Sequence, residues 1–185
     1  AQRPEPVREP VAEIPALSMD NISLAAGEAV LAPLVESVPY GEVPLALGRV
    51  DVLRELLARL EAQSFRGQVR AEYFVGEFCL TGTVDEGYAL APPELPARKC
   101  DLIGNPYDDA LGPAQHQSLA FANLASSVRR RTAEALTVEV APGGEKLKMP
   151  YPRSAENVTA GQWNEIAAQN NRVEFSAIVQ SPSAP

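Results

Sequence analysis

Strict alternation of apolar and polar residues predicts four β-strands in this chain. They cover residues 43–47, 68–78, 136–140 and 173–179. Pro44 places the first strand at a sheet edge or at its own start, because proline cannot donate a hydrogen bond to a neighbouring strand. After the third strand, Pro142-Gly143-Gly144 predicts a turn, and Leu147 and Met149 are candidates for a returning hairpin arm.

An apolar repeat close to 3.6 residues predicts three helices between these strands. The first covers residues 49–64, the second begins at Pro113 and ends near residue 131, and the third opens at Thr159. Proline suits the first turn of a helix, and Thr159 followed by Gln162 forms a capping box. The residues expected to face the core are Val50, Leu53, Leu57, Leu60, Ala120, Phe121, Leu124, Val128, Trp163 and Ile166.

The predicted order is therefore β-α-β-α-β-α-β. This order predicts an α/β fold of the α+β sandwich kind, in which a small mixed sheet carries helices mainly on one face. The chain has 185 residues and 17 prolines, about twice the usual share of roughly 5%. The proline-rich stretches divide it into a linker and N-terminal extension (1–42, with a candidate short helix at 25–34), a domain (43–179) and a tail (180–185).

Charge and composition exclude several functional classes. The net charge of −8 argues against nucleic-acid binding, which depends on clustered basic groups. No run of 18 apolar residues exists, so membrane contact is expected only through an anchor or leader removed ahead of the polar, proline-rich start. Two cysteines and one histidine are too few for an ordinary four-ligand zinc site. We predict neither a metal nor a cofactor.

The two cysteines flank a segment rich in glycine and proline, which predicts a loop over residues 79–100. A disulfide between Cys79 and Cys100 would stabilise the fold by roughly 3 kcal/mol and would place the protein in an oxidising compartment such as the periplasm. Two unpaired thiols in a reducing compartment are the alternative. Because no third cysteine competes for either partner, we predict the disulfide.

Isolated residues with possible chemistry have simpler interpretations. His116 lacks a catalytic constellation in the sequence and is expected to be an exposed helix residue. Asp101, Asp108 and Asp109 lack calcium-loop spacing and are typical of turns. The run Arg129-Arg130-Arg131 suits a solvated helix end, with contact to an acidic partner as the alternative. We therefore predict that the protein is not an enzyme.

Three segments are similar to the motifs of one family. Residues 170–175 read Asn-Asn-Arg-Val-Glu-Phe, residues 117–123 read Gln-Ser-Leu-Ala-Phe-Ala-Asn, and residues 72–77 read Glu-Tyr-Phe-Val-Gly-Glu. Together with the element order, they resemble a divergent OmpA-like domain, a module of the Gram-negative cell envelope. In that family, Gly-His-Thr-Asp ends a strand, Leu-Ser-x-x-Arg-Ala opens a helix and Asn-Arg-Arg-Val-Glu enters the last strand.

The resemblance implies a peptidoglycan site whose key residues are changed. In the family, the motif Asp and the helix Arg clamp the zwitterionic end of diaminopimelate, since an ammonium needs a carboxylate and Arg holds a carboxylate in a planar fork. Gly76 or Glu77 occupies the Asp position here, and Phe121 occupies the Arg position. The ligand-groove candidates are Gly76, Glu77, Phe121, Asn170, Asn171 and Arg172.

These departures predict that the diaminopimelate clamp is absent. The expected function is that of a non-catalytic, periplasmic envelope module that docks a protein partner as a structural or anchoring part of an assembly. The alternative is peptidoglycan binding through an altered site, with Glu77 supplying the acid and Arg172 or another basic group replacing the missing Arg.

Overall fold

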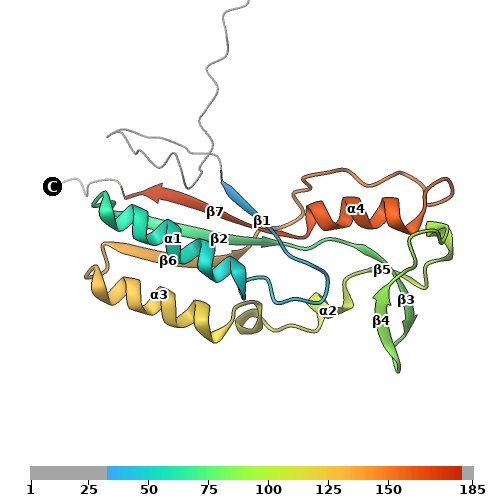
Figure 1. Cartoon of the computed structure of the whole chain (residues 1–185), viewed down its shortest axis with the longest axis horizontal. Helices are drawn as coiled ribbons and strands as arrows, with labels where there is room; N and C mark the ends of the chain where they lie inside the picture. Colours follow the sequence, from blue (N-terminus) through green and yellow to red (C-terminus); the bar gives the residue numbers. More distant parts are fainter. Residues whose placement is uncertain (1–32, 181–185) are drawn as a thin grey trace, which may run out of the picture.

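The computed structural model describes residues 33–180 and contains two β-sheets (Figure 1). The larger sheet has the strand order β1-β7-β2-β6, and we call it the main sheet. Its strands pair in antiparallel fashion except for β2 and β6, which are parallel. The sheet is therefore mixed, and the predicted fold class is confirmed. Its strands are β1 (Leu34–Ser37), β2 (Gly67–Phe74), β6 (Leu136–Pro142) and β7 (Arg172–Val179).

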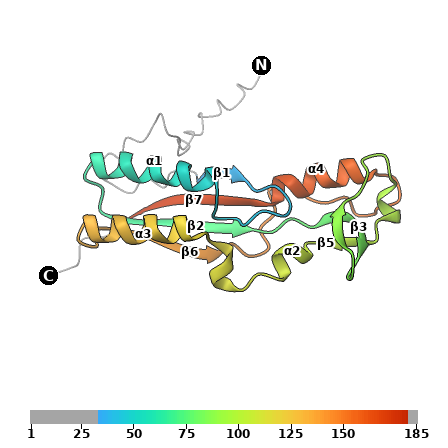
Figure 2. The ribbon, with the colours of Figure 1, turned by 60° about the horizontal axis from the view of Figure 1, so that its bottom comes forward.

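Two helices cover one face of the main sheet (Figure 2). They are α1 (Gly48–Ala62) and α3 (Leu119–Arg131), and their apolar stripes meet the inward residues of β2 and β7 in one core. Near the ends of the two helices, Arg131 donates two hydrogen bonds to the carboxylate of Glu61, at 2.6 and 3.0 Å. The buried residues of this core include Leu53, Leu57, Leu60, Val69, Ala71, Phe121, Val128, Val173 and Phe175.

The first strand lies earlier in the chain than predicted. Residues 43–47 do not form a strand and keep one isolated bridge, between Leu45 and Gln117. The edge position is taken instead by β1, which pairs with β7 from Leu34 to Ser37. The packed unit thus includes residues ahead of 43, the expected start of the domain. Most of the predicted linker (1–32), including most of the candidate helix at 25–34, and residues 181–185 lie outside the described residues.

The segment between the cysteines is not a plain loop. It carries a hairpin of β3 (Phe78–Thr83) and β4 (Gly87–Leu90), and a short 3₁₀ turn (Ala97–Lys99) leads to β5 (Leu102–Gly104) beyond Cys100. These strands form a second sheet in the order β4-β3-β5, which packs on α4 (Ala160–Asn170) beyond the end of the main sheet (Figure 1). We call this second sheet and α4 the lobe. Its buried residues form two clusters separate from the main core.

Three other predictions fail. The strand predicted over residues 68–78 ends at Phe74, and Phe78 begins β3 in the other sheet. The helix predicted from Pro113 is interrupted: a 3₁₀ turn (Pro113–His116) ends first, and Ser118 then caps α3 by accepting a hydrogen bond from the Phe121 amide. Ala120, expected in the core, is exposed. Leu147 and Met149 form no hairpin arm and lie in an exposed connection between β6 and α4.

The third predicted helix is confirmed as α4, including its capping box. The Thr159 side chain accepts from the Gln162 amide, and the Gln162 side chain accepts from the Thr159 amide. Within residues 33–180, no helix combines the length and hydrophobicity that a membrane span requires.

Candidate functional site

The candidate site lies where β2 ends and β7 begins, at the junction between the main sheet and the lobe. Asn171 is buried there between three segments of the chain. Its Oδ1 accepts from the Gly76 amide at 3.0 Å, and its Nδ2 donates to the Val38 carbonyl at 2.6 Å. The buried side chain of Asn105 also donates to the Gly76 carbonyl, at 3.2 Å. The neutral side-chain amide of Asn171 thus occupies the position where the resemblance places a ligand groove.

Local structure fixes both asparagines in place. Asn171 is the C-cap residue of α4, and its amide donates to the Ala167 carbonyl. Asn105 is the N-cap of the short helix α2 (Pro106–Asp109), and its Oδ1 accepts from the Asp108 amide at 3.1 Å. The sequence Asn-Pro is a typical start for a helix, because Asn caps it and Pro suits the first position. That signal in the sequence identifies Asn105 as a helix cap, although Asn105 is not among the groove candidates.

Arg172 and Asn170 face a different partner, the connection that follows β6. The Arg172 side chain is buried, pairs with Glu174 at 3.0 Å and lies over the Phe74 ring at 4.0 Å. Its remaining donors reach the carbonyls of Asn170 and Lys146. The buried Asn170 side chain bonds the backbone at positions 148 and 149 three times. Both side chains are buried and bonded to groups of this chain, so neither is presented to an external carboxylate in this arrangement.

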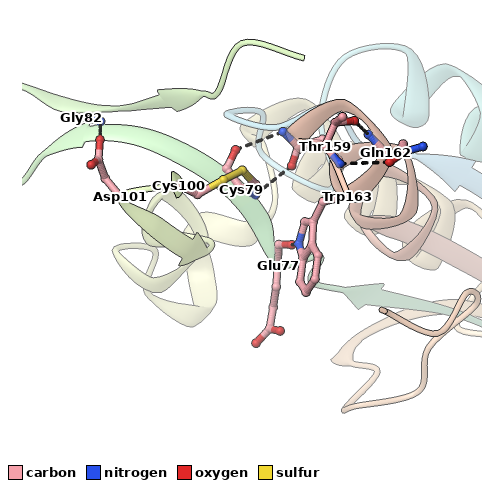
Figure 3. Close-up of a disulfide and its surroundings, with 9 residues drawn as sticks. Glu77, Cys79, Gly82, Cys100, Asp101, Thr159, Gln162 and Trp163 are labelled. Atoms are coloured by element: carbon pink, nitrogen blue, oxygen red, sulfur yellow. Dashed lines mark hydrogen bonds between the residues drawn. A yellow bond between two sulfur atoms is a disulfide. The ribbon is translucent and has the colours of Figure 1, made fainter. Parts of the chain in front are cut away.

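Glu77 is the candidate whose carboxylate remains in solvent. Its backbone is fixed, because the amide donates to the Tyr151 hydroxyl at 2.8 Å and the carbonyl accepts from the Trp163 indole at 2.9 Å. The side chain points away from the lobe (Figure 3). Trp163, expected to be a core anchor, is buried in the lobe and stacks on Tyr151. Glu77 is therefore an exposed acid on a rigid backbone.

Cys79 and Cys100 are joined by a disulfide, as predicted (Figure 3). Their Cα atoms lie 5.5 Å apart, within the usual range for such bonds. Asn164 of α4 reinforces the same point, because its side chain accepts from the Cys79 amide at 2.8 Å and donates to the Cys79 carbonyl at 3.0 Å. The hairpin of the lobe is thus held by a covalent bond and by the Asn164 side chain, which bonds both the amide and the carbonyl of Cys79 as a neighbouring strand would.

Phe121 does not belong to this site. It is 1% exposed and packs in the main core. The structure therefore brings Gly76, Asn170, Asn171 and Arg172 to one junction, with Glu77 at its rim, and separates Phe121 from them. The position that the resemblance assigned to a ligand-binding Arg is instead a structural apolar position.

His116 is buried, contrary to the expectation of an exposed helix residue. Its ring stacks on Tyr73 with centroids 4.3 Å apart, Nε2 lies 3.1 Å from Asp108 Oδ1 and Nδ1 lies 3.0 Å from the Gly112 carbonyl. Burial, and next the negative charge of Asp108, raise the pKa of the Tyr73 phenol above its usual value. Both ring nitrogens are occupied within the fold, so this histidine joins α2 to the main sheet.

A hollow of about 510 Å³ lies away from the junction, beside the start of β6. It is open and polar, and it includes Arg129, which pairs with the neighbouring Glu134. Arg129 and Arg131 both bond acids of this chain, which fits the predicted helix end. Within residues 33–180, no group of three potential ligands could hold a metal ion.

The tight packing at Gly76 predicts a measurable cost for adding one methyl group there. A Cβ at Gly76 would lie 2.3 Å from the Ala167 carbonyl oxygen, which is backbone and cannot rotate away. We expect Gly76→Ala to lower the free energy of unfolding by about 1–3 kcal/mol in urea titrations. Gly48→Ala is the matched control, since nothing lies within 4 Å of its added Cβ. Equal stabilities of the two variants would contradict the close approach of α4 to Gly76.

The comparisons with known proteins give one distant structural likeness. No protein-family model and no curated protein match the chain. A solved structure described as the cell wall anchor of the T6SS from Pseudomonas aeruginosa is similar with a TM-score of 0.37 and 13% identity, over 83% of this chain and 86% of that one.

Proposed function

We propose that this chain is a non-catalytic module of the cell envelope that docks a protein partner and does not clamp diaminopimelate. The observation that carries the proposal is the internal use of Asn171: its side chain bonds Gly76 and Val38, so the candidate groove is filled by the chain's own polar groups. Buried polar groups that are already paired gain little by exchanging partners, because each exchange only replaces one hydrogen bond by another.

The lobe supports a role in protein contact. The hairpin β3–β4 projects from the body of the molecule (Figure 1) and is fixed at its base by the disulfide and by Asn164. A rigid projection binds a partner with a smaller entropy loss than a mobile loop. The disulfide also supports an oxidising location such as the periplasm, where such bonds persist.

Co-sedimentation with purified peptidoglycan sacculi tests the first half of the proposal. We expect no saturable binding, because Gly76 and Phe121 cannot replace the carboxylate and the guanidinium of the family clamp. An intact OmpA-like domain serves as the positive control in the same assay.

Saturable binding that Glu77→Ala abolishes would contradict the proposal. It would establish the alternative, peptidoglycan binding through an altered site, because Glu77 is the candidate whose carboxylate is exposed.

A further inference from the structure

The loop of residues 143–149, here called the β6–α4 loop, presents large apolar side chains to solvent. Leu147 is 48% exposed and Met149 is 37% exposed. Lys146 and Lys148 alternate with them and are exposed as well. The loop also carries the exposed Glu145, so its two lysines leave it with a net charge of +1 in a chain whose net charge is −8.

The backbone of this loop is held from inside by some of the most buried polar side chains in the described part of the chain. Asn170, 1% exposed, accepts from the amides of Lys148 and Met149 at 2.8 and 2.9 Å and donates to the Met149 carbonyl at 2.8 Å. Arg172, 2% exposed, donates to the Lys146 carbonyl at 3.2 Å. The loop therefore has a defined path although its side chains lie in water.

The base of the loop is also fixed by close packing. Gly143 lies against the Phe74 ring, and a Cβ there would come within 2.3 Å of a ring carbon. The same ring carries Arg172 on its face. Gly143, Phe74 and Arg172 thus form one packed unit beneath the loop.

This combination indicates a presented surface and not a simple connection. Burying an arginine is costly unless it is fully paired, and a connecting loop could leave its backbone groups in water at no such cost. Fixing a loop in advance reduces the entropy lost on binding. Covering exposed apolar side chains with a partner lowers the free energy of the complex, and the adjacent lysines favour a partner that brings carboxylates.

We propose that the β6–α4 loop is a docking element for a protein partner whose surface has an apolar groove rimmed by carboxylates. Leu147 and Met149 enter the groove, and Lys146 and Lys148 pair with its rim. This inference rests on the proposed function, because it names the surface and the partner chemistry through which the module docks.

Site-specific photocrosslinking in the cells that make the protein tests the inference. A photoreactive amino acid replaces Met149 in one full-length variant, Val84 at the tip of the lobe hairpin in a second, and Leu119 on α3 in a third. Val84 and Leu119 are 84% and 77% exposed, against 37% for Met149, so both control positions are more accessible than the tested position and lack the two lysines. We expect a protein adduct at Met149 whose crosslinked segment contains apolar residues and several Asp or Glu.

Charge reversal supplies the second readout. Lys146→Glu with Lys148→Glu should reduce the yield of the Met149 adduct about tenfold, because like charges facing each other suppress association. Thermal unfolding should stay unchanged, because only the backbone of these two lysines is held by the fold.

The possible adducts distinguish a failure of the loop assignment from a failure of the docking function. Adducts at Met149 with lipid alone, or with a protein segment lacking carboxylates, would overturn the partner chemistry. Adducts at Val84 without any at Met149 would overturn the loop assignment and leave the docking function standing. Absence of protein adducts at both positions would overturn the docking function as well.

Discussion

Arg172→Ala should lower the free energy of unfolding by about 3–5 kcal/mol, the cost typical of removing one partner from a buried ion pair. The Arg172 side chain is 2% exposed and Glu174, its partner at 3.0 Å, is 13% exposed. Alanine would leave the Glu174 carboxylate without its cation in a poorly hydrated place. It would also remove the hydrogen bonds to the carbonyls of Asn170 and Lys146 and the cation from the Phe74 face.

The matched control is Arg70→Ala on the neighbouring strand of the same sheet. Arg70 pairs with Glu139 at 3.4 Å, and these side chains are 42% and 46% exposed. Water screens such a pair, so its removal should change the free energy of unfolding by about 0–1 kcal/mol. Chemical denaturation of both variants measures the two values. A loss below about 1 kcal/mol for Arg172→Ala would show that Arg172 is not a structural centre of this junction.

Arg172→Ala should also release the β6–α4 loop before it unfolds the domain. Amide hydrogen exchange at Lys148 and Met149 reports the loop directly, because both amides donate to the Asn170 side chain. Arg172→Lys is the informative second variant. Lysine keeps the charge near Glu174 but lacks the fork that also reaches the two carbonyls, so it should restore part of the stability and little of the loop protection.

The regular elements with clear apolar periodicity could be predicted from the sequence. The leucine stripe of α1 and the alternation in β7 both depend on one face being buried, which a single sequence records directly. The strand β1 could not be recognised in this way. It has only four residues, Leu34 to Ser37, and lies between Pro33 and Pro39, which are typical of irregular chain. Pairing with β7, not its own pattern, makes it a strand.

The candidate site was harder to predict for a related reason. Asn171 bonds backbone groups 95 and 133 positions away in the sequence, and backbone partners leave no residue signature. Motif similarity located Gly76, Asn170, Asn171 and Arg172 at one junction, but it also placed Phe121 there. Phe121 is apolar and lies on the inward face of α3, so helix periodicity alone predicts its burial in the core.

Loss of the disulfide should cost about 3 kcal/mol, because Cys79 and Cys100 close a loop with a separation of 21 residues. The lobe should lose stability first, because its buried clusters are separate from the main core. Hydrogen exchange with and without a phosphine reductant measures this. Protection should fall at β3 and β5, while the amides of β2 and β7 keep most of theirs, as expected for units that open independently.

A double Cys79→Ala, Cys100→Ala variant separates the bond from the packing of its sulfur atoms. Cys79 is fully buried beside Trp163, so the variant loses some packing in addition to the bond. It should be at least as destabilised as the reduced protein, and the reductant should then have no further effect on it. If reduction instead left the exchange of the lobe unchanged, the two hydrogen bonds between Asn164 and Cys79 would be sufficient to hold the hairpin, and the disulfide would contribute nothing to its rigidity.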